Sequence, residues 1–346
     1  MSGLIQRLGE FKGKQELYQR QMPQMLETLR QTAIIESTES SNRIEGITVS
    51  RKRFRELMAH PNKPQDRSEA EILGYRKALA AIHARHDGFS IDKDTICLLH
   101  KQIYENTDIA GGQWKKRDNT IEEKLSDGRW ITRFVPVSAR EAPYYIEQLC
   151  IRFERLRHKS GISPLILIPA FVLDFLCIHP FSDGNGRVSR LLTVLLLNQE
   201  NYYVGKFISL ERLIEESKET YYEALNKSSE SWHDSRHRLK PWFEYFLGVL
   251  IGAYKEFERR ASDKMTTRGA KTALVEEAIR NMPSLFKISD VERNCPSVSR
   301  DMIRIIINRF RDEGLIKCKG TGRGAVWEKG GNKPLKHGNK HGNKEK

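Results

Sequence analysis

The stretch HPFSDGNGRVSR occupies residues 179–190 and separates two strongly apolar segments, Pro164–Ile178 and Arg187–Leu197. Apolar residues recur at three- and four-residue spacing in both segments, which predicts a helix for each. Pro180 disfavours the right-handed helical conformation at His179, so the first helix should end there. A helix that stops at His-Pro and restarts after Gly-Asn-Gly indicates a loop with a chemical role.

The glycines of this loop favour binding of an anion. Gly184 and Gly186 permit positive φ, so successive backbone N–H groups can converge on one point. A helix that begins near Gly186 directs its N-terminal dipole into the same space. Arg187 and Arg190 are three residues apart and should project from one face of its first turn. Together these groups predict a polyphosphate site rather than a site for a single carboxylate.

Two further residues of the loop carry chemistry. The carboxylate of Asp183 would repel phosphates unless a cation lay between them, and one carboxylate with phosphate oxygens and waters is how Mg²⁺ is usually held. His179, with an ordinary pKa of about 6.5, can take a proton from an attacking hydroxyl. Each residue alone also fits a capped turn with a buried histidine, and Phe181 is expected to be a core anchor. The whole string predicts nucleophilic attack on a nucleotide phosphate.

The string matches the motif HPFx[D/E]GNGRxxR of the Fic (Fido) family at every defined position. The chain therefore resembles this family over roughly residues 68–250. The resemblance implies a mainly α fold, with a Fic-type helical core and a β-hairpin flap. It also implies a protein adenylyltransferase that uses ATP and Mg²⁺, moves AMP to a Ser, Thr or Tyr hydroxyl of a target protein or of itself, and releases pyrophosphate.

The resemblance assigns a role to each residue of the string. His179 would deprotonate the target hydroxyl, Asp183 would hold Mg²⁺, and Arg190 would bind the γ-phosphate. The α- and β-phosphates would be cradled by Gly184, Asn185, Gly186 and Arg187. Relatives that phosphorylate their target have Lys at the position of Gly186, so the glycine favours AMP transfer.

Two other segments resemble parts of the family's site. Residues 118–136 alternate β-favouring and polar residues around a turn at Ser126–Gly128, which predicts a β-hairpin. The resemblance makes this hairpin the flap that registers a target segment by strand-like pairing, with Ile121 as its clamp. Tyr221 and Tyr222 resemble the adenine-pocket segment, although two core aromatics on a helix are an equal alternative.

A third segment resembles the family's inhibitory motif. Residues Glu36–Glu45 predict a polar helix that ends at Gly46. Ser41, Glu45 and Gly46 fit the pattern [S/T]xxxE[G/N], here N-terminal to the core as in class II relatives. By this resemblance Glu45 pairs with Arg190 and keeps ATP in an unproductive pose. The alternative is a solvated acidic helix face. Some relatives use this glutamate to remove AMP from the target, and the sequence leaves that activity open.

The sequence predicts five successive regions. These are an N-terminal helical region (1–67, with the inhibitory helix at about 31–46), the Fic core (68–258), a polar linker (259–272), a winged helix-turn-helix (273–330) and a disordered basic tail (331–346). In the winged region we expect helices at Ala273–Met282, Ile288–Arg293 and Met302–Phe310, the last capped by Ser297 and ended by Gly314, and paired strands at Leu315–Lys317 and Ala325–Trp327.

The charge is concentrated in this C-terminal part. The chain carries a net charge of +14, of which residues 261–346 contribute +9. Arg300, Arg304 and Arg309 on the last helix, with Lys317, Lys319 and Arg323 around the wing, suit duplex DNA. Many winged helices bind proteins instead. The alternative function is therefore a nucleotide-sensing, DNA-binding transcriptional regulator, against which the intact His179 counts.

Other features limit the function classes. The five cysteines are scattered without a CxxC pair, which argues against a disulfide scaffold or a zinc site. No apolar run reaches the roughly 20 residues of a membrane span. The first residues contain no apolar segment of a secretory signal, so we expect a cytoplasmic protein, with a homodimer possible by resemblance. Further helices are expected at Leu17–Leu29, Ala70–Ile82, Ile96–Ile103, Ala142–Leu156, Tyr221–Leu225 and Pro241–Phe257.

Overall fold

The computed structural model describes residues 2–21, 23–60, 64–124, 128–159, 161–266, 270–295, 298–320 and 325–330. The chain divides into two compact units. The first comprises Met1–Glu16 and Gln24–Arg259, and the second comprises Leu17–Pro23 and Arg260–Lys346.

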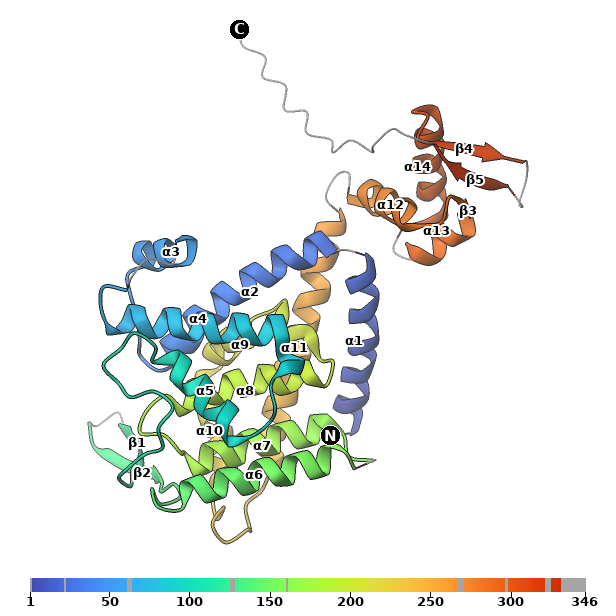
Figure 1. The fold of residues 1–346 in the computed structure, drawn as a ribbon. Coiled ribbons are helices and arrows are strands. Elements are labelled where there is room, and N and C mark those ends of the chain that lie inside the picture. Colours follow the sequence, from blue (N-terminus) through green and yellow to red (C-terminus); the bar gives the residue numbers. More distant parts are fainter. Residues whose placement is uncertain are drawn as a thin grey trace. The chain divides into compact units, whose positions relative to one another are not determined.

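The first unit is mainly helical, as the sequence predicts (Figure 1). Its long helices are α1 (Ser2–Gln21), α2 (Pro23–Ile44), α4 (Arg67–Arg85), α5 (Lys93–Ile103), α6 (Ala142–Arg157), α7 (Pro164–Ile178), α8 (Asn185–Gln199), α10 (Lys218–Ser229) and α11 (Lys240–Thr266). Shorter elements are α3 (Arg51–Ala59), α9 (Leu210–Glu216), and the 3₁₀ turns η1 (His86–Gly88) and η2 (Tyr203–Lys206).

The predicted helices are present, with one correction near the N-terminus. The segment Leu17–Leu29 is not one helix, because α1 ends at Gln21 and α2 begins at Pro23. Proline lacks a backbone N–H and suits the first turn of a helix better than its interior, so the break falls there. The sequence patterns did not predict the greater part of α1, and they did not predict α3 or α9.

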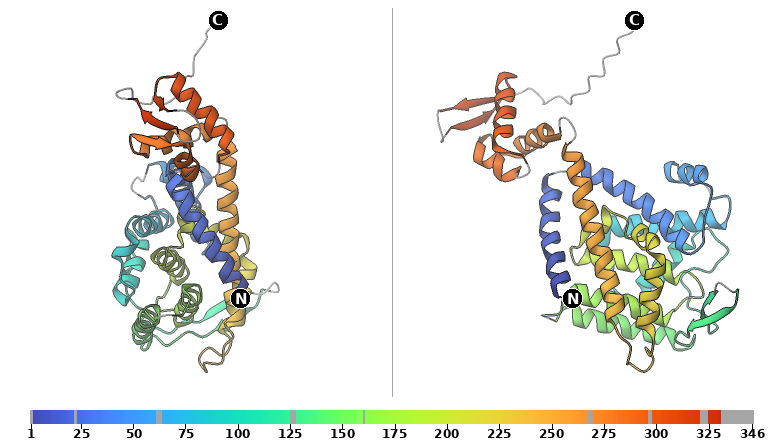
Figure 2. Two further views of the ribbon diagram at one scale, coloured as in Figure 1. Left: turned by 90° about the vertical axis from the view of Figure 1, so that its right-hand side faces the viewer. Right: turned by 180° about the vertical axis from the view of Figure 1, so that it is seen from behind.

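Helix α8 is the centre of the first unit. It packs against α4, α5 and α7, and the views in Figures 1 and 2 show it enclosed by them. All its residues from Arg187 to Asn198 are buried. A helix that is buried on every side is held rigidly by its neighbours. The loop at its N-terminus therefore stands on a fixed base.

A two-stranded antiparallel sheet lies in the segment where the sequence predicts a hairpin. Strand β1 (Ile121–Lys124) pairs with β2 (Trp130–Phe134), and Gly128 has the positive φ of a turn glycine, +86°. The predicted turn residues 126 and 127 lie outside the described residues. The end of β2 is tied to the loop after α10, because His233 stacks on Phe134 at 5.5 Å and its Nε2 lies 2.8 Å from the Val135 carbonyl.

Among the described residues, the second unit includes the last residues of α1 and α11, three helices of its own and a three-stranded antiparallel sheet of order β3-β5-β4. Its elements are α12 (Ala270–Asn281), β3 (Leu285–Lys287), α13 (Ile288–Asn294), α14 (Arg300–Asp312), β4 (Ile316–Lys319) and β5 (Val326–Lys329). The predicted pairing of the last two strands is present, with Cys318 opposite Trp327. Strand β3 was not expected.

Two predictions for this unit need correction. Helix α14 is capped by Ser299, whose Oγ accepts from the Met302 N–H at 3.4 Å, whereas the predicted cap Ser297 lies outside the described residues. The segment 259–272 is largely helical, because α11 continues to Thr266 and α12 begins at Ala270. Its alanines, lysines and arginines are good helix formers, and so a helix forms there without an apolar stripe. The wing turn 321–324 and the tail 331–346 lie outside the described residues.

None of the described helices combines the length and the apolar character that a membrane span requires. The cysteines at 97, 150, 177, 295 and 318 carry free thiols.

Candidate active site

His179 ends helix α7 in a left-handed conformation, with φ of +51°. Its N–H still donates to the Phe175 carbonyl at 2.9 Å. The imidazole Nδ1 lies 3.2 Å from the carbonyl oxygen of Leu176. A carbonyl only accepts, so Nδ1 carries the proton and Nε2 of the neutral ring keeps a lone pair. The backbone thus selects the tautomer that a general base needs.

The protonation state of His179 fits the same role. Burial lowers the pKa of His179 to about 4, and the nearby charge of Lys115 adds to this effect. A buried imidazole disfavours its charged form, because desolvation penalises the charge. At neutral pH the ring is therefore uncharged and able to accept a proton.

The loop after His179 is closed by hydrogen bonds of Asn185 to Phe181. Asn185 Nδ2 donates to the Phe181 carbonyl at 2.8 Å, and its Oδ1 accepts from the Phe181 N–H at 2.9 Å. Phe181 is fully buried, as expected of a core anchor. The amide of Asn185 is thus used to fold the loop, so the predicted contribution of Asn185 to a phosphate cradle is limited to its backbone.

His100 on α5 supports the loop by contacts with two of its residues, and the sequence patterns did not predict this role. Its Nδ1 accepts from the Gly112 N–H at 2.7 Å, so the other nitrogen, Nε2, donates to the Asp183 carbonyl at 3.1 Å. The ring also stacks on Phe181 with centroids 3.8 Å apart. A single histidine on a helix has no local pattern that marks such a role.

The N-terminus of α8 is open to an anion. Gly184 precedes the helix at φ of +78° and supplies no side-chain cap. A side chain at this position would also be too close to Tyr104, since an added Cβ would lie 2.9 Å from its hydroxyl oxygen. The first N–H groups of a helix need partners from outside, and a bound anion can supply them.

Asp183 stands at the edge of this helix terminus. Its side chain is 55% exposed; Oδ1 accepts from the Gly184 N–H at 2.7 Å, and Oδ2 accepts from Arg67 at 3.3 Å. The described residues contain no group of three or more His, Cys, Asp or Glu side chains that would cage a metal. One accessible carboxylate beside an anion site fits Mg²⁺ held jointly with phosphates and waters.

Arg187 and Arg190 both point toward the end of α2, as a common face predicts, since Arg187 Nη1 lies 3.5 Å from Asn42 Oδ1 and Arg190 Nε lies 2.8 Å from Ser41 Oγ. Arg187 is nevertheless held in a buried ion pair. Its guanidinium is fully buried, donates to the carboxylate of Glu71 on α4, and donates to the Tyr104 hydroxyl at 2.7 Å. Glu71 is itself buried and also accepts from Arg67 at 2.5 Å. A buried carboxylate needs a cationic partner, and Arg187 fills that need. In this conformation it supports the loop from inside.

A cavity of about 850 Å³ brings together most of the other predicted residues. This volume suits a nucleotide-sized ligand. The predicted residues that line it are Glu45, Ile121, His179, Gly186, Arg190, Tyr221 and Tyr222.

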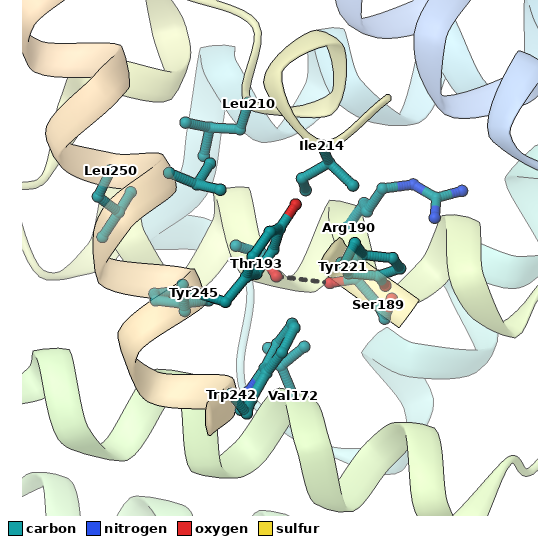
Figure 3. Close-up of a pocket in the computed structure, with 12 residues that line it drawn as sticks. Val172, Ser189, Arg190, Thr193, Leu210, Ile214, Tyr221, Trp242, Tyr245 and Leu250 are labelled. Atoms are coloured by element: carbon teal, nitrogen blue, oxygen red, sulfur yellow. Dashed lines mark hydrogen bonds between the residues drawn. The ribbon is translucent and has the colours of Figure 1, made fainter. Parts of the chain in front are cut away.

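The two tyrosines play different parts. Tyr221 is buried and packs on Trp242 and Tyr245, and these three residues and Arg190 all line a small cavity of about 20 Å³ (Figure 3). Tyr222 is 40% exposed and lines the large cavity. One of the two is therefore largely a core aromatic, and the other is available to a ligand.

The predicted pair of Glu45 and Arg190 is present. Arg190 Nη2 donates to Glu45 Oε1 at 2.7 Å and to the Ser41 carbonyl at 2.9 Å, and Nε donates to Ser41 Oγ at 2.8 Å. The carboxylate also lies directly over the start of α8, since a Cβ added to Gly186 would be 2.2 Å from Glu45 Oε1. An acidic side chain of this chain thus occupies the position that the sequence predicts for an anion.

The end of α2 fixes Glu45 in this place. Gly46 has φ of +80°, its N–H donates to the Arg43 carbonyl, and the Ile47 N–H donates to the Asn42 carbonyl, each at 3.0 Å. These are the two bonds of a Schellman motif. The acidic side chains of Glu36, Glu39 and Glu45 keep partial exposure to solvent, so the structure does not contradict the alternative of a solvated acidic face. The polar residues that are buried on this helix are uncharged. They are Ser37, Thr38, Ser40, Ser41 and Asn42.

Comparisons with known proteins give Fic-type relatives and Fic-type folds. Residues 90–197 match the model of the Fic/DOC family. Over 171 residues the chain is 30% identical to "Protein adenylyltransferase fic-1" of Caenorhabditis elegans, which covers 46% of this chain and 30% of that protein. It is also 30% identical over 168 residues to "Protein adenylyltransferase Fic" of Drosophila melanogaster, with 46% and 31% covered. The chain thus spans about a third of the length of these relatives.

Two solved structures share the fold. A Fic family protein from Desulfovibrio desulfuricans aligns with a TM-score of 0.61 and 20% identity over 96% of both chains. A Fic domain containing signaling protein from Bacteroides thetaiotaomicron aligns with a TM-score of 0.60 and 19% identity, over 75% of this chain and 98% of that one.

Proposed function

We propose that this chain, which carries a Fic-type domain, is a protein adenylyltransferase that moves AMP from ATP to a hydroxyl of a target protein. One observation carries the proposal. A single cavity holds a neutral histidine with Nε2 unprotonated, the N-terminus of α8, which has no side-chain cap and is covered by Glu45, and the guanidinium of Arg190. A base, a phosphate site and a cation in one cavity suit phosphoryl chemistry on a nucleotide.

The reaction follows from these positions. The target hydroxyl oxygen attacks the α-phosphorus while His179 Nε2 takes its proton. The bond between the α-phosphorus and the bridging oxygen breaks, and pyrophosphate leaves. The backbone N–H groups at the start of α8 stabilise the charge that grows on the phosphate oxygens. Asp183 would hold Mg²⁺, which neutralises phosphate charge when bound.

The remaining cavity residues orient the two substrates. Arg190 would bind the γ-phosphate once Glu45 releases it. Tyr222 offers a partly exposed ring to the adenine. Strand β2 offers a sheet edge to an extended target segment, with Ile121 facing the cavity from β1.

The transferred group is tested by position-specific labels. The Glu45→Gly variant, incubated with Mg²⁺ and ATP in host lysate, is expected to label protein from α-³²P-ATP and not from γ-³²P-ATP, because Gly186 leaves no lysine to direct phosphorylation. Label from the γ-position would show a kinase instead. Mass spectrometry of the labelled protein, this chain included, gives the mass added and the residue modified.

A second candidate, duplex DNA binding by the second unit, rests on helix α14. It follows α13 as the second helix of a helix-turn-helix, and Arg304, Ile305 and Asn308 are exposed along one side. Arg300 pairs with Glu292 at 2.8 Å, and Arg304 lies 3.9 Å from Asp301. Such exposed pairs contribute little and exchange readily for phosphates.

We expect the protein to bind a labelled 24-base-pair duplex, which is about two turns of DNA at 10–10.5 base pairs per turn. The affinity should fall steeply between 50 and 200 mM salt. A double change, Arg300→Ala with Arg304→Ala, should weaken binding about tenfold by fluorescence anisotropy while AMP transfer is unchanged. Lys227→Ala, an exposed cation of the first unit, serves as the control. Equal affinity of the double variant and wild type would exclude α14 as the DNA contact.

A further inference from the structure

A buried line of hydroxyl groups joins Arg190 to a second carboxylate. Arg190 Nε donates to Ser41 Oγ at 2.8 Å, and the Tyr75 hydroxyl donates to Glu211 Oε1 at 2.9 Å. Ser41 and Arg190 both lie close enough to the Tyr75 hydroxyl to act against the rise of its pKa. The four residues are at most 3% exposed. They come from four different helices, namely α8, α2, α4 and α9.

The hydrogen bonds of this line can run in one direction only. The guanidinium only donates, so Ser41 Oγ accepts from Arg190 and keeps its own proton to donate elsewhere. Ser41 lowers the pKa of Tyr75, which is the effect of a donor near the phenol oxygen. A carboxylate only accepts, so the Tyr75 proton points to Glu211. Burial raises the pKa of Tyr75, and the phenol keeps its proton at neutral pH. The line therefore leads from a cation to an anion through two hydroxyls.

Glu211 needs such a connection. Its other oxygen accepts from Ser37 Oγ at 2.6 Å and Ser209 Oγ at 3.4 Å. Within the described part of the chain it forms no salt bridge. A buried carboxylate without a cation is costly unless hydrogen bonds and a nearby charge compensate it. Arg190 supplies that charge, and the hydroxyls between them are polarised in the same sense.

We infer that Tyr75 and Glu211 are positioning residues that orient Arg190 for the γ-phosphate of ATP, an inference that rests on the function proposed above. The line holds the Nε side of the guanidinium, so that Nη2, which now contacts Glu45, faces the cavity. Tyr75 and Glu211 lie on α4 and α9 and do not touch Glu45. The orientation therefore persists when the Glu45 carboxylate is removed or withdrawn.

The test compares two nucleotides that differ in the γ-phosphate. Starting from Glu45→Gly, the added change Tyr75→Phe removes the hydroxyl and keeps the ring. Isothermal titration with Mg²⁺ and α,β-methylene-ATP, which resists cleavage at the α-phosphate, should show about tenfold weaker binding, while AMP binds with unchanged affinity. Glu211→Gln should shift the affinities in the same direction. Tyr254→Phe removes another buried hydroxyl, one that donates to Gln15 at 3.1 Å, and should change neither affinity.

Each outcome decides between the inference and its premise. Equal weakening of both nucleotides, or no change in either, would overturn the positioning role, and melting temperatures show whether a variant is folded. Where Tyr75→Phe does not fold, Glu211→Gln gives the same comparison. Arg190→Ala in the Glu45→Gly protein tests the premise separately. If it leaves binding of the ATP analogue unchanged, the proposed γ-phosphate contact is wrong. If it weakens binding and Tyr75→Phe does not, only the positioning role is wrong.

Discussion

Glu45→Gly is expected to raise the rate of AMP incorporation about a hundredfold. The change removes the carboxylate 2.7 Å from Arg190 Nη2 and over Gly186, so both the cation and the start of α8 become available to phosphates. A charge pair at about 4 Å is worth roughly 4 kcal/mol at an effective dielectric near 20, and partial screening lowers this value. Lowering the activation free energy of AMP transfer by about 2.7 kcal/mol corresponds to a hundredfold increase in its rate. Incorporation of label from α-³²P-ATP measures it.

The matched control lies on the same helix. Glu39 is also on α2, pairs with Arg43 at 3.2 Å and does not line the cavity. Glu39→Gly introduces the same residue one turn and a half earlier, so any general weakening of α2 appears there as well. An increase with Glu39→Gly equal to that with Glu45→Gly would show that loosening of the helix, not the loss of the carboxylate, activates the protein.

His179→Ala, made in the Glu45→Gly protein, is expected to lower AMP transfer by about a thousandfold. A positioned general base contributes roughly 10² to 10⁴ in rate. His179 has its Nδ1 held by the Leu176 carbonyl and no second basic group is placed by this loop at the same point. Nucleotide binding should persist, since the start of α8 and Arg190 remain. Initial rates with α-labelled ATP, together with titration of the ATP analogue, separate the two effects.

His158→Ala is the matched histidine variant. His158 is 78% exposed at the end of α6 and contacts Glu154 at 3.3 Å. The His158→Ala change, made in the Glu45→Gly protein, should leave the rate of AMP transfer the same as in Glu45→Gly alone. Retention of more than a tenth of the rate by His179→Ala would show that another group, or water, accepts the proton, and the assignment of His179 as general base would fail.

Local sequence predicts the parts of the site that depend on neighbouring residues. Pro180 ends α7 at His179, Gly184 starts α8, and Gly46 ends α2, since each of these depends on backbone conformation over a few residues. The presence of the hairpin likewise follows from alternation and a turn. These features depend on residues that are close together in the sequence, so local sequence patterns are enough to predict them.

The supporting contacts depend on helices that meet only in the folded protein. His100 on α5 holds the loop and Glu71 on α4 holds Arg187, yet each looks like an ordinary helix residue in the sequence. The spacing on α8 predicts that Arg187 and Arg190 share a face, but it does not show that the buried carboxylate of Glu71 holds the guanidinium of Arg187.

The contact between Glu45 and Gly186 has a consequence for how this sequence can vary. A methyl carbon added at position 186 would lie 2.2 Å from Glu45 Oε1, so the end of the Glu45 side chain would have to move away from its present contact with Arg190. The two positions therefore constrain each other across distant parts of the chain. Among homologues that keep an acidic residue at the end of the second helix, position 186 should remain glycine, and where it has diverged the acidic residue should have been lost with it.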